Sequence, residues 1–186
     1  MHKAVFLDRD GTIVEDVGYL NSPQQLQFIP GSIEAIKKLN EAGYKVVVIT
    51  NQAGVAKGLI SEDMLQTIDK TLQKFILSGG AYLDGLYYCP HHPEHGLYPY
   101  KQDCQCRKPK PGLFKKAEKD LNIDLARSWM IGDKATDVEA GQRAGTKTVF
   151  VMTGKGKKEK DRLRKKPDYI AENLKQAVAW LFNNKL

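Results

Sequence analysis

The feature that most constrains this chain is a short apolar run near the N-terminus that ends in two carboxylates. Residues 5–7 are Val-Phe-Leu, and Asp-Arg-Asp-Gly-Thr follows directly at residues 8–12. Such a run predicts a buried strand whose tip lies in the crevice where open α/β sheets bind ligands. Side chains two residues apart in a strand share a face, so we expect the carboxylates of Asp8 and Asp10 to lie together. Close carboxylates require a cation or a shared proton, which favours Mg2+, although the pattern alone is equally typical of an acidic turn.

Strand-like and helix-like segments alternate along the rest of the chain. Further strands are predicted over residues 44–49, 83–88, 129–133, 146–152 and 169–170. Helices are predicted over residues 31–42, 61–77, 111–121, 137–144 and 174–182, with loops over 15–28 and 54–58. This alternation is typical of parallel βαβ units. We therefore expect a doubly wound, mainly parallel sheet flanked by helices, in one α/β domain that spans all 186 residues without a cap domain.

The composition argues against a membrane or a nucleic acid as the partner of this chain. The apolar runs have the length of strands, and the N-terminus lacks a secretory signal, so we expect a cytoplasmic monomer without membrane contact. Most of the net charge of +7 comes from residues 155–166, KGKKEKDRLRKK, which hold eight bases and two acids. We interpret this segment as solvated, in preference to a contact with nucleic acid or an anionic substrate. No aromatic residue interleaves with its bases, so nucleic acid is not the expected partner.

A second metal site is predicted where the three cysteines of the chain gather in one loop, residues 89–106. Three cysteines cannot form an even set of disulfides, and four nitrogen and sulfur ligands suit tetrahedral zinc with no open coordination position. The predicted ligands are Cys89, His91, Cys104 and Cys106. His92 and His95 are alternatives for the histidine. Zinc at this site would be structural, because the loop has too few apolar residues to fold alone.

Polar groups at four predicted strand ends complement one another. Carboxylates occur at Asp8, Asp10, Asp133 and Asp137, neutral hydrogen-bonding groups at Thr50 and Asn51, and bases at Arg107, Lys108 and Lys134. Because parallel strands end at one edge of a sheet, we expect these groups to converge. Acids that hold a cation beside bases that hold an anion indicate chemistry on a phosphate ester.

Four segments in order, FLDRDGT, VVITN, CRKPKP and MIGDKATD, resemble the motifs of the haloacid dehalogenase superfamily of phosphohydrolases. The resemblance covers residues 4–150 and implies that Asp8 is the nucleophile that forms an aspartyl phosphate. It implies that Asp10 is the general acid and then the general base, while Thr50 and Lys108 bind the transferring phosphoryl group. The implied Mg2+ ligands are Asp8, Asp133 and the main-chain carbonyl of Asp10. Asp137 either supports this metal indirectly or caps a helix.

The cysteine loop makes the chain resemble the capless branch of this superfamily, in which such a loop takes the place of a cap. The resemblance implies removal of the C7 phosphate of a heptose bisphosphate, which supplies heptose 1-phosphate for nucleotide-activated heptose and lipopolysaccharide or surface polysaccharide. The alternatives are histidinol phosphate as substrate, a polynucleotide 3′-phosphatase, or a nucleic-acid-binding module. The implied substrate contacts are Asp16, Val17, Gly18, Tyr19, Thr50, Asn51, Gln52, Ala53, Arg107, Lys108 and Lys134.

Overall fold

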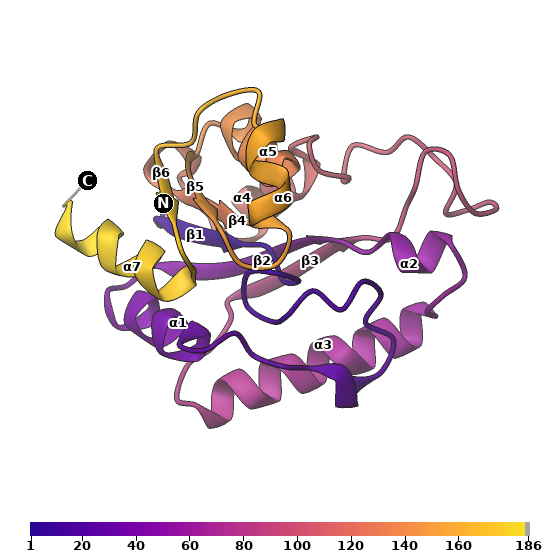
Figure 1. Cartoon of the computed structure of the whole chain (residues 1–186), viewed down its shortest axis with the longest axis horizontal. Coiled ribbons are helices and arrows are strands. Elements are labelled where there is room, and N and C mark those ends of the chain that lie inside the picture. Colours follow the sequence, from indigo (N-terminus) through magenta and orange to yellow (C-terminus); the bar gives the residue numbers. More distant parts are fainter. Residues whose placement is uncertain (185–186) are drawn as a thin grey trace.

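The computed structural model describes residues 1–184, and its strands form one six-stranded sheet in the order β3-β2-β1-β4-β5-β6 (Figure 1). The strands are β1 (Ala4–Leu7), β2 (Lys45–Asn51), β3 (Gly85–Cys89), β4 (Trp129–Gly132), β5 (Lys147–Val151) and β6 (Tyr169–Ala171). Every neighbouring pair is parallel. This confirms the predicted doubly wound α/β class. The strand order reverses beside β1, and the crevice for ligands therefore lies between the carboxyl ends of β1 and β4.

Helices cover both faces of the sheet (Figure 1). They are α1 (Ser32–Glu41), α2 (Ala53–Ala56), α3 (Glu62–Ser78), α4 (Gly112–Leu121), α5 (Ala135–Ala144), α6 (Gly156–Glu159) and α7 (Leu174–Asn183). One core cluster joins α1, α3 and α7 to one face of the sheet, and a second joins α4 and α5 to the other. Side chains alternate along β1 between the two clusters: Val5 and Leu7 pack in the first and Phe6 in the second. Burial on both faces explains the continuous apolar runs of the strands.

Local sequence signals account for most element boundaries. Ser61 caps α3, because its hydroxyl accepts a hydrogen bond from the Met64 N–H (3.1 Å). Three expectations were wrong in detail. The expected loop at 54–58 contains the short helix α2, the second strand continues to Asn51, and α5 begins at Ala135 rather than Asp137. The last difference arises because the carboxylate of Asp137, the third residue of α5, accepts the Lys134 N–H (3.0 Å).

The basic segment, residues 155–166, is mostly exposed, as we expected, but part of it is helical and lies against the strand tips. Its first half forms α6 and the short 3-10 helix η3 (Lys160–Arg162). Three of its residues, Lys155, Glu159 and Arg162, line a cavity at the strand tips. Within residues 1–184, no helix combines the length and the apolar character needed to cross a bilayer.

Candidate active site

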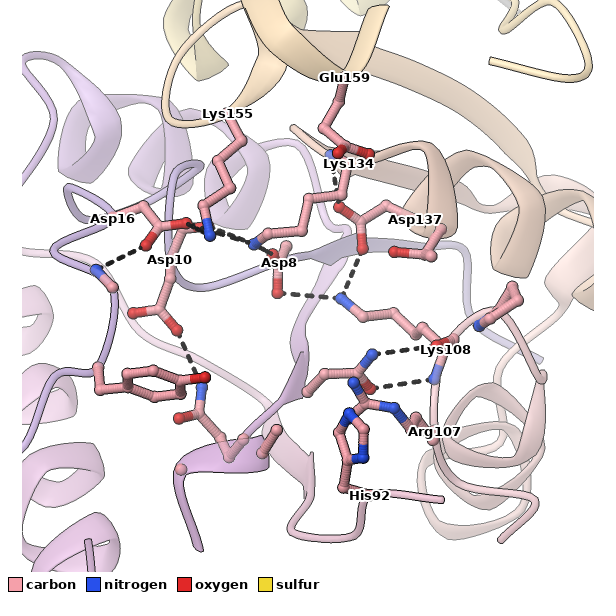
Figure 2. Close-up of a pocket in the computed structure, with 18 of the residues that line it drawn as sticks. Asp8, Asp10, Asp16, His92, Arg107, Lys108, Lys134, Asp137, Lys155 and Glu159 are labelled. Atoms are coloured by element: carbon pink, nitrogen blue, oxygen red, sulfur yellow. Dashed lines mark hydrogen bonds and ion pairs between the residues drawn. The ribbon is translucent and has the colours of Figure 1, made fainter. Parts of the chain in front are cut away.

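A cavity of about 740 Å3 lies at the tips of β1, β2 and β4. Cavities of this volume hold small-molecule ligands. Figure 2 shows acidic and basic side chains that converge on it from separate segments of the chain. Among the predicted site residues, those that line it are Asp8, Asp10, Asp16, Gly18, Tyr19, Asn51, Gln52, Ala53, Arg107, Lys108 and Lys134. Asp133 is fully buried beside them. The predicted convergence of strand tips is therefore present.

Asp8 lies at the centre of the charged groups. Its Oδ1 accepts a hydrogen bond from the Nζ of Lys108 (2.9 Å), and its Oδ2 accepts one from the Nζ of Lys134 (3.2 Å). Burial alone would raise the pKa of Asp8, but these two ammonium groups hold the pKa well below its usual range. Asp8 is therefore ionised at neutral pH, as a carboxylate nucleophile must be.

Lys108 is buried and held from several directions. Its Nζ also donates to the carbonyl of Ile49 (2.7 Å) and lies 2.7 Å from the Oδ1 of Asp137. Burial would lower the pKa of Lys108, but Asp137 and Asp8 raise it, so the ammonium stays charged. The Asn51 side chain accepts the Lys108 N–H and donates to the Lys108 carbonyl, both at 3.0 Å. Asn51 was predicted to contact substrate, yet its amide is used to fix the backbone of Lys108.

The oxygens that were predicted to hold Mg2+ surround a single position. The Nζ of Lys134 lies 3.2 Å from Asp8 Oδ2, 3.3 Å from the main-chain oxygen of Asp10 and 3.5 Å from Asp133 Oδ1. That Asp133 oxygen is buried and accepts no hydrogen bond in residues 1–184, and burial with Asp8 and Asp137 nearby raises the pKa of Asp133 to about 7. Hard oxygens that converge on one cation fit Mg2+.

Asp137, whose role the sequence left undecided, belongs to the same group of acids. The carboxylate of Asp137 lies beside those of Asp8 and Asp133. One carboxylate oxygen of each residue lies within 4.8 Å of the oxygens of the other two. Asp137 both caps α5 and pairs with Lys108. The cap agrees with one of the two alternatives considered for Asp137, and its other carboxylate oxygen faces Lys108.

Asp8 and Asp10 lie beyond the end of β1 and not within the strand, where we expected them to share a face. β1 ends at Leu7, and the chain turns at once, so the alternation of side chains stops before Asp8. The Asp10 carboxylate instead pairs with the guanidinium of Arg9 (3.0 Å) and accepts a hydrogen bond from the Gln52 amide (2.9 Å). Both acids nevertheless line one cavity.

Two predicted substrate contacts lie away from the cavity lining. Thr50 is buried, and its hydroxyl accepts a hydrogen bond from the Gln52 amide (2.8 Å). Val17 is exposed, and it is not among the lining residues although its neighbours Asp16 and Gly18 are. An extended loop turns successive side chains in different directions, so a run of consecutive residues does not all face one ligand.

The cysteine loop forms a compact cluster beside β3. One ligand atom from each of the predicted zinc residues, Cys89, His91, Cys104 and Cys106, lies within 4.8 Å of the other three. The sulfurs are 3.0–3.4 Å apart, and the Nδ1 of His91 is 3.3 Å from the sulfur of Cys106. Hydrogen bonding with Cys89, Cys104 and His91 lowers the pKa of Cys106 to about 5. Three sulfurs and one nitrogen that face one another fit tetrahedral zinc.

The spare histidine candidates are directed elsewhere. The Nδ1 of His92 accepts the backbone N–H groups of Glu94 and His95, both at 3.1 Å. His92 lines the active-site cavity and packs against His95, with ring centroids 4.4 Å apart and the ring planes tilted by 34°. His91 is therefore the histidine that belongs to the cluster of three cysteines.

Sequence reasoning missed the groups that hold the site together. Arg9 is fully buried and pairs with Asp69 of α3 (2.9 Å) as well as with Asp10. Lys155 and Glu159 come from the basic segment. Asp69 could have been found from its position among the apolar residues on one side of the α3 sequence. No feature of the sequence connects residues 155–166 with the tip of β1.

The parallel sheet with acids at the tips of β1 and β4, beside a buried lysine, has the architecture of a haloacid dehalogenase-like hydrolase. A family model described as Haloacid dehalogenase-like hydrolase matches residues 5–79, and a second, described as HAD-hydrolase-like, matches residues 105–177. The chain belongs to this family, as the four motifs predicted.

Particular relatives narrow the comparison. The D-glycero-beta-D-manno-heptose-1,7-bisphosphate 7-phosphatase of Pasteurella multocida is 48% identical over 94% of each chain. The enzyme of that name from Haemophilus ducreyi is 46% identical over 96% of this chain and 98% of its own. A crystal structure of D,D-heptose 1,7-bisphosphate phosphatase from B. bronchiseptica, complexed with magnesium and phosphate, has a TM-score of 0.88 and 32% identity. The matched region covers 98% of this chain and 99% of the chain in that crystal structure.

Proposed function

We propose that this hydrolase is a Mg2+-dependent phosphatase that removes the C7 phosphate of D-glycero-beta-D-manno-heptose 1,7-bisphosphate. The observation that carries the chemistry is the convergence of Asp8, Asp133 and Lys108 at one cavity. The substrate rests on the relatives, which are 46–48% identical over nearly the whole chain and bear this activity in their names. The beta configuration at C1 follows the same relatives.

In the proposed reaction Asp8 attacks the phosphorus and forms an aspartyl phosphate. Its Oδ1 bonds to Lys108, which would offset the charge of the phosphoryl oxygens during transfer. Asp10 would protonate the leaving sugar oxygen and then take a proton from the hydrolytic water. Arg9 and Gln52 hold the Asp10 carboxylate at the cavity.

Asp8, Asp133 and the main-chain oxygen of Asp10 would hold Mg2+, while Lys134 moves toward the substrate. When bound, the metal supplies positive charge that lets an anionic nucleophile approach an anionic ester. This assignment is supported by the three oxygens that converge on one ammonium. It is also supported by the magnesium and phosphate in the related crystal structure.

The substitution Asp8→Asn tests the mechanism, because an amide cannot form an acyl phosphate. We expect phosphate release from the bisphosphate to fall by at least about 10³-fold, with the thermal melting curve still cooperative. Release would be measured on purified protein with Mg2+. Turnover near the wild-type rate in this variant would reject the covalent mechanism.

Substrate choice is tested separately on the wild-type protein. We expect kcat/KM for the heptose bisphosphate to exceed that for histidinol phosphate by at least about 10²-fold. Histidinol phosphate has no second phosphate, so the groups of the site that bind this phosphate would be left without a hydrogen-bond partner. A preference for histidinol phosphate would leave the phosphatase class standing and overturn the substrate.

We further propose that Cys89, His91, Cys104 and Cys106 hold structural zinc, which anchors the residues just before Arg107 and Lys108. Purified protein should contain about one zinc per chain, and its removal by a strong chelator should lower the thermal midpoint and activity together. Cys104→Ser should have the same effect. Full stability in zinc-free protein would contradict a structural role.

A further inference from the structure

The basic segment, residues 155–166, forms part of the wall of the active-site cavity. Lys155, Glu159 and Arg162 line it. In Figure 2, Lys155 and Glu159 enter the cavity from the side opposite Arg107 and His92. A ligand in the cavity would therefore lie between the basic segment and the cysteine loop.

Three contacts fix the basic segment to the catalytic elements. The Lys155 N–H donates to Asp133 Oδ2 (2.7 Å), and the Lys155 Nζ lies 3.4 Å from Asp16 Oδ2. The Glu159 Oε2 accepts the N–H of Ala135 at the start of α5 (3.4 Å). The segment is thus held at both ends of its first turn, and its side chains have defined positions.

Glu159 also determines where Arg162 lies. The other oxygen of the Glu159 carboxylate, Oε1, pairs with Arg162 Nη1 at 2.6 Å. One carboxylate therefore joins α5 to the guanidinium. An arginine side chain has five N–H donors, so this pair leaves donors for a ligand.

The cations of the cavity differ in depth and in how far they are already neutralised. The side chain of Lys108 is 2% exposed and is paired with two acids, whereas that of Arg162 is 73% exposed. Lys134 faces Asp8, Asp16 and Asp133. The deep lysines suit the phosphoryl group that reacts, and Arg162 lies at the mouth, where a second anion of a long substrate would emerge.

Building on the proposed function, we propose that Arg162, positioned by Glu159, binds the C1 phosphate, which is not cleaved. A planar guanidinium can donate two parallel hydrogen bonds to phosphate oxygens, which gives direction as well as charge. Lys155 adds a positive charge on the same wall. The basic segment would then select bisphosphates over monophosphates.

The test compares two substrates, D-glycero-beta-D-manno-heptose 1,7-bisphosphate and heptose 7-phosphate, on wild type, Arg162→Met and Lys158→Met. Lys158 is a matched control because it is an exposed cation of the same segment that does not line the cavity. In Arg162→Met we expect the kcat/KM preference for the bisphosphate to fall about ten-fold, mainly through KM. In Lys158→Met the preference should be retained, and Arg162→Lys should restore only part of the loss.

An unchanged preference in Arg162→Met, or an equal loss in Lys158→Met, would overturn the assignment of Arg162 while leaving the proposed function intact. Failure of the wild-type protein to release phosphate from the bisphosphate would instead overturn the proposed function. Because the Arg162 side chain is exposed, we expect its substitution to affect ligand binding and not folding.

Discussion

At the scale of single residues, the site depends on charges that are held ionised inside the protein. Asp8 and Lys108 stabilise each other's charged form, since each is the other's hydrogen-bond partner at 2.9 Å. A buried pair of this kind requires accurate geometry to offset the cost of desolvation. Asn51 supplies part of that geometry through its two hydrogen bonds to the Lys108 backbone.

Replacing Asn51 by Ala should therefore impair catalysis more than folding. We expect a loss of about 1–3 kcal/mol in the free energy of unfolding from two lost hydrogen bonds, and a fall of at least about ten-fold in kcat as Lys108 shifts. Asn40 is the matched control, because its side chain makes the same two bonds to the Tyr82 backbone, at 3.0 and 3.1 Å. Asn40→Ala should lose stability only, and equal kcat losses in both variants would contradict the positioning role.

At the scale of elements, α3 is tied to the tip of β1 by a buried ion pair. Arg9, fully buried, joins Asp69 of α3 at 2.9 Å to Asp10 at 3.0 Å. The helix therefore does more than cover the sheet, since its acid orients the arginine that holds the Asp10 carboxylate. This link explains why an amphipathic helix carries an acid on its buried side.

The substitution Asp69→Ala should remove one of the two ion-pair partners of the buried Arg9 guanidinium. We expect a loss of about 3–5 kcal/mol in the free energy of unfolding, measured by urea denaturation. Asp120→Ala is the control, because it removes an exposed ion pair with Lys116 that is worth at most about 1 kcal/mol. Similar losses in the two variants would show that burial of the Arg9 pair has little energetic effect.

At the scale of the whole molecule, the fold brings three carboxylates together at one buried point. Asp8, Asp133 and Asp137 come from the tips of β1 and β4 and the start of α5. Their mutual repulsion and burial raise the pKa of Asp133 to about 7. A bound divalent cation would relieve that repulsion and so stabilise the fold.

Stabilisation by Mg2+ should therefore depend on pH. The pKa of Asp133 is higher in the folded protein than the ordinary value of about 4, so its proton stabilises the fold fully below about pH 4. That contribution is lost as pH rises to about 7. Because metal and proton compete for one carboxylate, saturating Mg2+ should raise the thermal midpoint by about 5–10 °C at pH 8 and by less at pH 6.

Thermal melts at both pH values, with Mg2+ or EDTA, measure this difference. Asp133→Asn should remove most of the increase at either pH, because a neutral amide binds Mg2+ weakly. A larger increase at pH 6 than at pH 8 in the wild-type protein would contradict competition with the proton.

The sequence by itself determined the class of fold and predicted which polar groups gather at the tips of its strands. Both follow from local order: apolar runs of strand length alternate with helical periodicity, and the polar groups come at the ends of strands or in the loops that follow them, at one edge of a parallel sheet. Cys89, His91, Cys104 and Cys106 could likewise be grouped in advance as candidate metal ligands, because the loop that holds them has too few apolar residues to fold alone.

Only the tertiary structure decided which groups face one another. The Asn51 amide bonds the backbone of Lys108, Asp69 reaches Arg9 across 60 residues, and the basic segment lies beside Asp133. These contacts join residues far apart in the chain, and the direction of each side chain depends on how helices pack on the sheet. No periodicity or local motif carries that information.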